Sequence, residues 1–517
     1  MGLVETDRGR TFERLASGRF DLLVIGGGII GAGVACEASR AGLAVALVDR
    51  ADFGSQTSSA SSKLIHGGLR YLRLGDIRLV REAHRERRAL MQVVAPHLVR
   101  RQAFLLPLYR NGPYHPLAVQ AGLWTYSALA GERHGRLVPP ERARRSVPSL
   151  LIEELRACGV YADAWTHDSR LCLANVQASA AAGAVVANYV EATALRIAGG
   201  RVVGAELRDR LDGESLAVEA RAVVNATGPW IDGVRRLEDP GAAPSVQLSK
   251  GVHVFLELTE RWTAALTIPH DKVRVSFAVP WEGMLLLGTT DTSYERSPDE
   301  LAVTEDEIRA VLAEAAVALE PDAVRADAVK STSAGLRVLP IARGPTARAR
   351  RETVLLRGRA GMLTVAGGKL TTYRRIALQA LAALRSDLAL RRIDGPPVPL
   401  PGAAGLAEVT ARLARSHPQV KPEIRAHLAH LYGLCAEDVL ALGAADSKLL
   451  EPLAPGAPDI AAQAVYARER EWACTAHDIL FRRTTVGPRG LEPKQGDAQD
   501  DENRPDHARG TESLFEK

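Results

Sequence analysis

The sequence predicts an α/β fold: a parallel-sheet domain is interleaved with a mostly antiparallel β domain and followed by an α-helical domain. Three observations predict this. A strand, a glycine-rich turn, a helix and a second strand succeed one another within residues 20–49, about 30 residues being the size of a βαβ unit. Short β runs recur between residues 184 and 366, and residues 404–485 have helical periodicity without strand signals.

The first unit is predicted from short, well-separated patterns. Residues 21–25 (DLLVI) form an apolar run typical of a buried parallel strand. Residues 26–31 are the glycine turn, residues 30–40 wind as a helix, and residues 44–49 (AVALVD) form the next strand. A further helix is expected over residues 77–94.

The helix over residues 77–94 begins after Asp76, which can cap it, and ends before Pro96. Its arginines, Arg78, Arg81, Arg85 and Arg88, fall on a face largely opposite the apolar stripe. Two interpretations stay open for this face. It is either a solvated surface paired with Glu82 and Glu86 or a basic stripe that faces a membrane or partner.

The second domain is predicted from β runs at 252–256, 273–279, 284–287 and 362–366, after hairpin turns near residues 199–200 and 212–213. Four prolines between residues 396 and 401 mark a boundary. The predicted organisation is a lead-in over 1–19, interleaved cofactor and substrate domains over 20–395, a helical domain over 396–487 and a disordered tail over 488–517.

Composition excludes several classes of protein. Of 517 residues, 46% are hydrophobic and 25% charged, which is ordinary for a globular chain and excludes disordered or collagen-like proteins. The longest apolar stretch, 22–36, is too short for the roughly 18–20 residues of a membrane span, and no signal peptide is expected.

Five scattered cysteines predict neither a disulfide framework nor a metal site. The net charge of +5 allows an anionic substrate or a membrane surface; no nucleic-acid partner is expected.

The glycine turn has the spacing of a dinucleotide site. Gly26, Gly28 and Gly31 form G-x-G-x-x-G between a strand and a helix; they permit a tight turn, close approach of a pyrophosphate and close helix–strand packing. The helix N-terminus offers free N–H groups to phosphates. Asp49 follows Gly28 by 21 residues and can bind a ribose 2′-hydroxyl. The motif by itself does not distinguish FAD from NAD.

Three later segments favour the larger cofactor, because an extended FAD touches several distant pieces of one domain. Residues 57–68 (TSSASSKLIHGG) are rich in hydroxyls and end in a glycine pair. Residues 225–230 (NATGPW) close a strand with a sharp turn. Residues 367–374 (GGKLTTYR) open a helix, whose N-terminus can stabilise the negative charge of a reduced flavin.

Together these segments resemble the FAD-dependent glycerol-3-phosphate dehydrogenases of the aerobic, respiratory type. The resembling stretches are DLLVIGGGIIGAGVACEASRAGL, TSSASSKLIHGGLRYL, VNATGPWID, SKGVHVFL, LLLGTTDT, AGLRVLP and GGKLTTYR, with YAREREWACTAHDILFRRT resembling part of the family's helical cap. The resemblance covers about residues 20 to 487. Its most specific pieces are SSKLIHGGLRYL and GGKLTTYR, which the wider amine and amino-acid oxidases do not share.

The resemblance implies a Rossmann-type FAD-binding domain and a set of FAD contacts. These are Gly26, Gly27, Gly28, Ile29, Gly31, Asp49, Ser58, Ser59, Ser62, Lys63, Leu64, His66, Gly67, Gly228, Gly368, Lys369, Leu370 and Thr371. It further implies that electrons pass to a quinone or another membrane acceptor. The expected location is therefore cytoplasmic and peripheral on the inner face of the cytoplasmic membrane, and a homodimer is compatible with it.

The implied reaction oxidises sn-glycerol 3-phosphate at C2 to dihydroxyacetone phosphate, with hydride transfer to flavin N5 and loss of the hydroxyl proton to a base. A phosphate dianion requires cations, preferably forked arginines. Motif matching assigns Arg337 and Lys369 to catalysis and substrate binding, and Arg351 to substrate binding. Surface cations are the alternative, above all for Arg351, whose loop holds several arginines. The family's G-V-R-P reads Gly335-Leu336-Arg337-Val338 here, with the proline displaced to Pro340.

His66 is the candidate general base, because a neutral imidazole has a pKa near working pH and the adjacent glycines permit close approach to the flavin. The alternative is a packed histidine without a catalytic role. His253 is the reserve candidate for the base and is also assigned to substrate binding.

Two other functions are compatible with parts of the pattern. A related flavin oxidase would pass electrons to O2 and act on glycerol 3-phosphate or on an amino acid. A non-catalytic flavin-binding redox sensor would keep Gly26, Gly28, Gly31 and Asp49 but would need no substrate cations.

Overall fold

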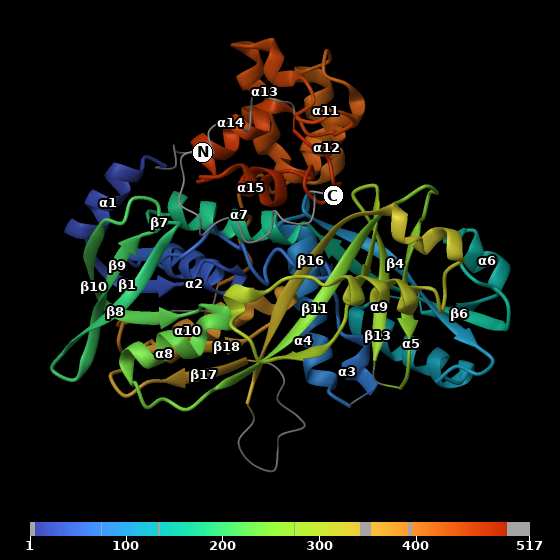
Figure 1. Cartoon of the computed structure of the whole chain (residues 1–517), viewed down its shortest axis with the longest axis horizontal. Helices are drawn as coiled ribbons and strands as arrows, with labels where there is room; N and C mark the ends of the chain where they lie inside the picture. The colour runs from blue at the N-terminus through green and yellow to red at the C-terminus, as the bar shows by residue number, and fades with distance from the viewer. Residues whose placement is uncertain are drawn as a thin grey trace.

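Two β-sheets lie side by side, and a layer of helices from the C-terminal part of the chain covers the same end of both (Figure 1). The computed structural model describes residues 6–73, 75–132, 135–272, 274–341, 353–390 and 395–493. The predicted α/β class with a C-terminal helical domain is confirmed. The disorder expected for the tail concerns residues that, from 494 on, lie outside the described part of the chain.

The first sheet is mostly parallel and contains the predicted βαβ unit. Its order is β17-β18-β10-β1-β2-β7, with the β8/β9 hairpin beside β10. Strands β17, β8 and β9 run antiparallel to their neighbours and the others run parallel. The bounds are β1 Arg19–Ile25, β2 Val45–Val48, β7 Val185–Ala187, β8 Val190–Ala198, β9 Arg201–Asp209, β10 Ser215–Asn225, β17 Thr353–Arg357 and β18 Leu363–Gly367. The strands predicted at 21–25 and 44–49 are confirmed.

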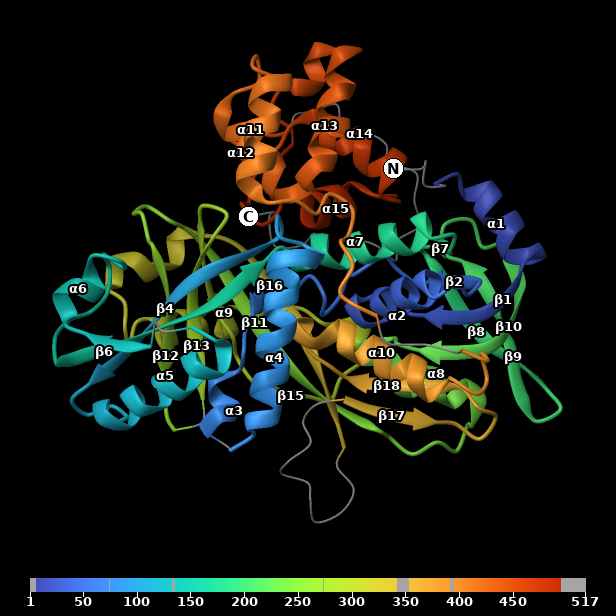
Figure 2. The ribbon, with the colours of Figure 1, turned by 180° about the vertical axis from the view of Figure 1, so that it is seen from behind.

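Helices cover one face of this sheet, because a parallel sheet must be buried on both sides. The helices α2 (Ile29–Arg40), α7 (Asp168–Ala181) and α10 (Tyr373–Ala383) share one apolar core with strands β1, β2, β10 and β18; they are seen best from behind (Figure 2). The opposite face packs on α1 (Arg8–Ser17) and on the β8/β9 hairpin.

The second sheet is mostly antiparallel, with the order β15-β11-β14-β13-β12-β4-β6-β3, and with β16 beside β11 and β5 beside β6. Its bounds are β3 Leu64–Ile65, β4 Val99–Tyr109, β5 Arg136–Val138, β6 Leu155–Thr166, β11 Val246–Glu257, β12 Ala264–Pro269, β13 Val275–Trp281, β14 Met284–Gly288, β15 Thr292–Tyr294 and β16 Val329–Pro340. The β runs predicted at 252–256 and 284–287 are confirmed. The long strands β4 and β6 were not predicted from the sequence.

One β run was assigned to the wrong domain. Residues 362–366 were expected in the second, antiparallel sheet, but β18 lies in the first sheet, parallel to β10 through Val224 and Leu363. The physical reason is that alternation and turn signals identify a strand but do not identify its partner, which long-range pairing decides.

The remaining helices that precede the C-terminal domain pack on strands of the two sheets or on one another. They are α3 Leu69–Arg73, α4 Ile77–Ala89, α5 Pro116–Ala130, α6 Pro140–Arg144, α8 Ile231–Glu238 and α9 Glu305–Ala315. The Asp76 side chain caps α4 by accepting from the Leu79 N–H, and the helix continues as a π-helical turn, Leu90–Val94. The four arginines of α4 are exposed as predicted, but Glu86 is buried and pairs with Arg374 at 3.3 Å. Glu86 therefore does not belong to a solvated face.

The C-terminal helices form a core of their own and dock onto the rest through buried charges. They are α11 Leu406–Ser416, α12 Pro422–Tyr432, α13 Ala436–Ala441, α14 Ala461–Arg470 and α15 Ala476–Asp478. Asp52 accepts from Arg482 at 2.5 Å and from Arg483 at 2.5 and 2.8 Å. Burial acts to raise the pKa of Asp52, but the charges of Arg483 and Arg482 outweigh it and lower that pKa to about 2. The carboxylate is therefore ionised at every physiological pH.

Replacing Asp52 with Asn tests how far this ion cluster holds the helical domain. The variant removes the counter-charge of the buried Arg483 and one of the two carboxylates that pair with Arg482, the other being Asp478. We therefore expect a loss of about 3–5 kcal/mol in the free energy of unfolding. Thermal and urea unfolding of the variant measure it. The exposed Arg412–Glu437 pair provides the control, because Glu437→Gln should cost less than about 1 kcal/mol. Equal losses of stability in both variants would contradict the role of the Asp52 ion cluster in holding the helical domain.

Candidate active site

One cavity of about 2800 Å³ is lined by residues from both sheets. It exceeds the roughly 300–1000 Å³ of an ordinary ligand pocket, so it has room for a dinucleotide and a small substrate together. Most of the predicted site residues line it, although they come from distant parts of the chain. They are Gly26, Gly28, Ile29, Asp49, Ser58, Ser62, Leu64, His66, Gly228, His253, Arg337, Gly368, Lys369, Leu370 and Thr371.

Five of the predicted site residues that the structure describes are not among those that line this cavity. Gly27, Gly31, Ser59, Lys63 and Gly67 lie just behind its wall, and Arg351 lies outside the described residues. The structure brings the first five beside the site, while their proposed contacts with a cofactor stay predictions.

The glycine turn allows the closest helix–strand approach in the site. Gly26 has φ +105°, a conformation that favours glycine. A Cβ on Gly31 would lie 1.8 Å from the carbonyl oxygen of Gly26, so no larger residue fits there. Gly28 is the N-cap of α2, and the Ile29 N–H donates to Ser58 Oγ at 2.9 Å. This arrangement places an open helix N-terminus on the cavity wall, as binding of a pyrophosphate requires.

Asp49 is held by the same turn. Its carboxylate accepts from the Gly27 N–H at 2.6 Å and from the Ala51 N–H at 2.9 Å. Burial raises the pKa of Asp49 to about 6, in spite of these two hydrogen bonds. At neutral pH the carboxylate is mostly ionised, so it can accept hydrogen bonds from the hydroxyls of a ribose.

The hydroxyl-rich loop is held from behind by a buried acid. Lys63 Nζ lies 2.7 Å from Asp168 Oδ1 and 4.8 Å from the ring centroid of Trp281. Asp168 also accepts from Ser61 Oγ at 2.7 Å. The Lys63 side chain therefore supports the loop from inside the protein, which the sequence did not indicate.

A second buried acid holds the chain beside His66. The Gly67 N–H donates to Asp163 Oδ1 at 3.0 Å, and Asp163 also accepts from Arg87 at 2.5 Å and from the Tyr126 hydroxyl at 2.9 Å. A Cβ on Gly67 would lie 2.2 Å from His84 Cε1, so a larger residue here would require the His84 ring to move. The backbone at His66 is thereby positioned at the cavity.

Both candidate substrate cations are oriented by their neighbours. Arg337 Nη2 donates to Thr289 Oγ1 at 2.6 Å and to the Thr290 carbonyl at 2.8 Å. Gly251 on the neighbouring strand β11 leaves room for the guanidinium group, because a Cβ there would lie 2.5 Å from Arg337 Nη2. Lys369 Nζ lies 4.0 Å from the ring centroid of Tyr71. The two cations thus line one cavity in positions suited to an anion.

Both candidate bases also line the cavity. His253 Nε2 lies 2.9 Å from Ser62 Oγ. Burial, reinforced by the positive charges of Arg337 and Lys63, lowers the pKa of His253 to about 3, so this imidazole stays neutral. The backbone N–H of His66 donates to Thr371 Oγ1 at 3.1 Å. The geometry is compatible with either histidine as the base.

Sequence reasoning missed the residues that support the site, chiefly Asp163, Asp168 and Tyr71. Asp163 stands in a mostly apolar run, residues 157–165, and an acidic residue in such a run signals a buried, paired carboxylate. Asp168 lies in the polar run 166–170, which carries no such signal. Nothing in the local sequence indicates their partners, which lie about 100 residues earlier.

Two family models match consecutive parts of the chain. Residues 21–374 match the FAD dependent oxidoreductase model, and residues 396–490 match the C-terminal domain of alpha-glycerophosphate oxidase.

Similar proteins cover nearly the whole chain. A glycerol-3-phosphate dehydrogenase 2 of Mycobacterium bovis is 35% identical over 494 residues, which is 93% of this chain and 83% of that protein. An aerobic glycerol-3-phosphate dehydrogenase of Staphylococcus haemolyticus is 31% identical over 94% of this chain and 90% of its own. The solved structure of a Bacillus halodurans glycerol-3-phosphate dehydrogenase complexed with FAD superposes with a TM-score of 0.76 and 28% identity, covering 94% of this chain and 90% of that chain.

Replacing Asp49 with Asn tests the dinucleotide site. The amide keeps the shape but removes the charge that binds a ribose hydroxyl, a hydrogen bond worth about 1.5–3 kcal/mol. We expect the dissociation constant for FAD, measured by recovery of flavin fluorescence, to rise about 10- to 100-fold. Asp21→Asn, at a carboxylate that pairs with Arg221 away from the cavity, should leave it unchanged. An Asp49→Asn variant that binds FAD as tightly as the wild type would refute the assignment.

Proposed function

The chain belongs to the family of FAD-dependent oxidoreductases that carry the C-terminal domain of alpha-glycerophosphate oxidases, and we propose on this premise that it is a respiratory glycerol-3-phosphate dehydrogenase. It oxidises sn-glycerol 3-phosphate to dihydroxyacetone phosphate with FAD as its cofactor. The observation that carries the assignment is one cavity lined by a dinucleotide turn, two oriented cations and two histidines.

The residues of the cavity fit an FAD. The glycine turn offers the α2 N-terminus to the pyrophosphate, and Asp49 offers an ionised carboxylate to the ribose. Gly368, with φ +124°, leads into the helical turn that begins at Leu370, whose N–H groups suit the ring end of the cofactor. FAD, when bound, supplies the hydride acceptor of the reaction.

The substrate is bound and deprotonated by residues of this chain. Arg337 and Lys369 neutralise the phosphate, and the hydrogen bonds of Arg337 to Thr289 orient its guanidinium in advance. His66 or His253 accepts the proton of the C2 hydroxyl. Burial and the positive charges of Arg337 and Lys63 lower the pKa of His253 to about 3, so its neutral imidazole is a weak base. His66 lies between the Thr371 contact and the Gly67–Asp163 hydrogen bond, which hold its backbone in place.

For the electron acceptor we propose a quinone, reached at the inner face of the cytoplasmic membrane. Helix α5 exposes Leu117 (74%) and Trp124 (64%); seven residues apart, they share one face of the helix. Its other side contributes Ala118, Val119 and Leu123 to the cavity wall. No helix among the described residues has the length and apolar character to cross a membrane.

The neighbouring helix carries exposed positive charge. Helix α4 packs on α5, with Arg88 donating to the Ala130 carbonyl at its end, and presents exposed Arg78, Arg81 and Arg85 together with Ile77, which is 45% exposed. Apolar side chains beside arginines suit an anionic membrane surface. The predicted basic stripe thus supports the membrane interpretation.

Anaerobic addition of sn-glycerol 3-phosphate to the purified holoenzyme tests the function. We expect the oxidised flavin absorbance to bleach and to return on addition of a soluble quinone, with little peroxide formed in air. A flavin that does not bleach would refute sn-glycerol 3-phosphate as the substrate. Stoichiometric peroxide without quinone reduction would show an oxidase instead.

Replacing Arg337 with Met tests the phosphate site. Loss of one charge-assisted contact, worth about 1.5–3 kcal/mol, should lower kcat/KM about 10- to 100-fold, mainly through KM. Steady-state kinetics measures it, and inorganic phosphate should inhibit the variant less than the wild type. Lys330→Met is the matched control, since Lys330 lies on the same strand and pairs at the surface with Glu257. Equal kinetics of the Arg337 variant and the wild type would exclude the assigned contact.

A Leu117→Ser/Trp124→Ser double variant tests the membrane surface. Each side chain loses up to about 1.5–3 kcal/mol of apolar burial, so co-sedimentation with anionic phospholipid vesicles should fall at least about tenfold while activity with a soluble acceptor persists. Ile197→Ser, at an apolar residue 47% exposed on β8, is the control. Unchanged vesicle binding would show that another surface of the protein binds the membrane.

A further inference from the structure

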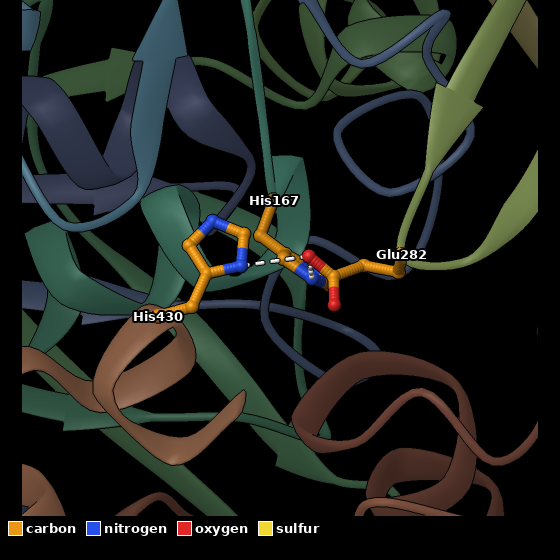
Figure 3. A group of neighbouring side chains, drawn as sticks. All are labelled: His167, Glu282 and His430. Atoms are coloured by element: carbon orange, nitrogen blue, oxygen red, sulfur yellow. Dashed lines mark ion pairs between the residues drawn. The ribbon is translucent and has the colours of Figure 1, made fainter. Parts of the chain in front are cut away.

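Outside the cavity, the structure brings His167, Glu282 and His430 together at a junction of three regions (Figure 3). His167 precedes α7 at the end of β6, Glu282 lies in the β13–β14 turn, and His430 belongs to α12 of the helical domain. Their side chains are only 4%, 8% and 3% exposed. They belong to no part of the proposed reaction.

The three groups converge on one point. Glu282 Oε1 lies 2.7 Å from His430 Nδ1 and 3.6 Å from His167 Nε2, and the donor atoms of all three lie within 4.8 Å of one another. His167 Nε2 is buried and has no hydrogen-bond partner within the described part of the chain. A buried ring nitrogen directed at a carboxylate without bonding to it signals a ligand between them, because unpaired buried polar atoms are costly.

A fourth donor lies beside the three. His427 Nδ1 is 3.5 Å from Glu282 Oε2, and its Nε2 is 2.8 Å from Asp459 Oδ1. Asp459 in turn accepts from Thr485 Oγ1 at 2.6 Å and from Gln463 Nε2 at 3.0 Å. A carboxylate that orients a histidine in this way leaves the other ring nitrogen directed at a metal, as in many metal sites.

We propose that His167, Glu282, His430 and His427 bind one Zn²⁺ ion, or a divalent transition metal of similar chemistry. Imidazole and carboxylate donors suit Zn²⁺, whereas Mg²⁺ and Ca²⁺ prefer oxygen ligands alone. A divalent charge also balances the two buried carboxylates, Glu282 and Asp459. The donor atoms of His167, Glu282 and His430 already lie within 4.8 Å of one another. His427 lies outside that group and must move closer to complete a tetrahedral site, whose donors lie about 2.0–2.2 Å from the ion.

The site is structural and not catalytic. The ring of Trp281 lies 4.6 Å from that of His167 and the ring of Trp165 lies 5.0 Å from that of His430, so aromatic side chains enclose the donors. The four donors are absent from the lining of the large cavity. An ion here joins α12 of the helical domain to β13–β14 and to the start of α7. Metal binding therefore stabilises the docking of the helical domain.

Metal analysis of the untagged, full-length holoenzyme is the first test. We expect about one equivalent of zinc per chain by mass spectrometry of the digested protein, lost on treatment with a strong chelator. Returning Zn²⁺ should raise Tm by about 2–5 °C, and Co²⁺ should give the visible absorption of a tetrahedral site. A chelated but folded protein that binds neither Zn²⁺ nor Co²⁺ would overturn the proposal and leave a cluster held by protonated imidazoles.

Variants separate this site from adventitious binding. Glu282→Gln and His430→Gln should reduce the zinc content at least about tenfold and abolish the Zn²⁺-dependent rise in Tm. His417→Gln, at a histidine on the surface of the same domain, should retain both. Zinc content that falls equally in the His417 control would overturn the proposal. If the cluster variants fail to fold, the Co²⁺ spectrum of the wild type decides.

Discussion

The contact between Gly31 and the carbonyl of Gly26 is the constraint on which the rest of the cofactor site depends. Because a Cβ on Gly31 would lie 1.8 Å from that oxygen, helix α2 can start against the end of β1 only with glycine there. This start places the N-terminus of α2 at the carboxyl edge of the parallel sheet, where open α/β sheets bind their ligands. The Asp49 carboxylate, bound to the Gly27 N–H, completes the same turn.

The substrate side of the cavity depends on buried acids that hold loop segments in place. Asp168 holds the hydroxyl-rich loop through Lys63 and Ser61, and Asp163 holds the chain at Gly67. Both acids come from β6 of the second sheet or from the residues directly after it. They therefore position the loop at residues 57–68, which follows strand β2 of the first sheet. The loop is therefore held in place where the two sheets meet. One cavity there can hold a cofactor and an anionic substrate together.

Buried ion pairs link the helical domain to the rest of the chain. Asp52 pairs with Arg482 and Arg483, and Arg170 pairs with Glu471 at 2.7 Å, all of them buried. Buried pairs offset a large desolvation cost and add little net stability, but a docking mode that leaves any of these charges unpaired is strongly disfavoured. These pairs therefore specify one orientation of the domain, and the proposed metal site acts at the same junction.

The sequence by itself determined the local part of this protein. The glycine turn, the strands at 21–25 and 44–49, the Asp76 cap, Asp49 and the C-terminal helical pattern follow from neighbouring residues, because backbone conformation and periodicity are short-range properties. The site residues Arg337 and Lys369 were identified through motif resemblance, and their position in one cavity needed the fold.

Only the tertiary structure decided which distant residues meet. It assigned β18 to the first sheet, buried Glu86 against Arg374, directed Lys63 at Asp168 and gathered His167, Glu282 and His430. In each case the partners are separated by roughly 100 residues or more, and no local pattern encodes such a pairing. The physical reason is that burial and charge pairing are satisfied by the packed chain as a whole, whereas a sequence window contains only one of the partners.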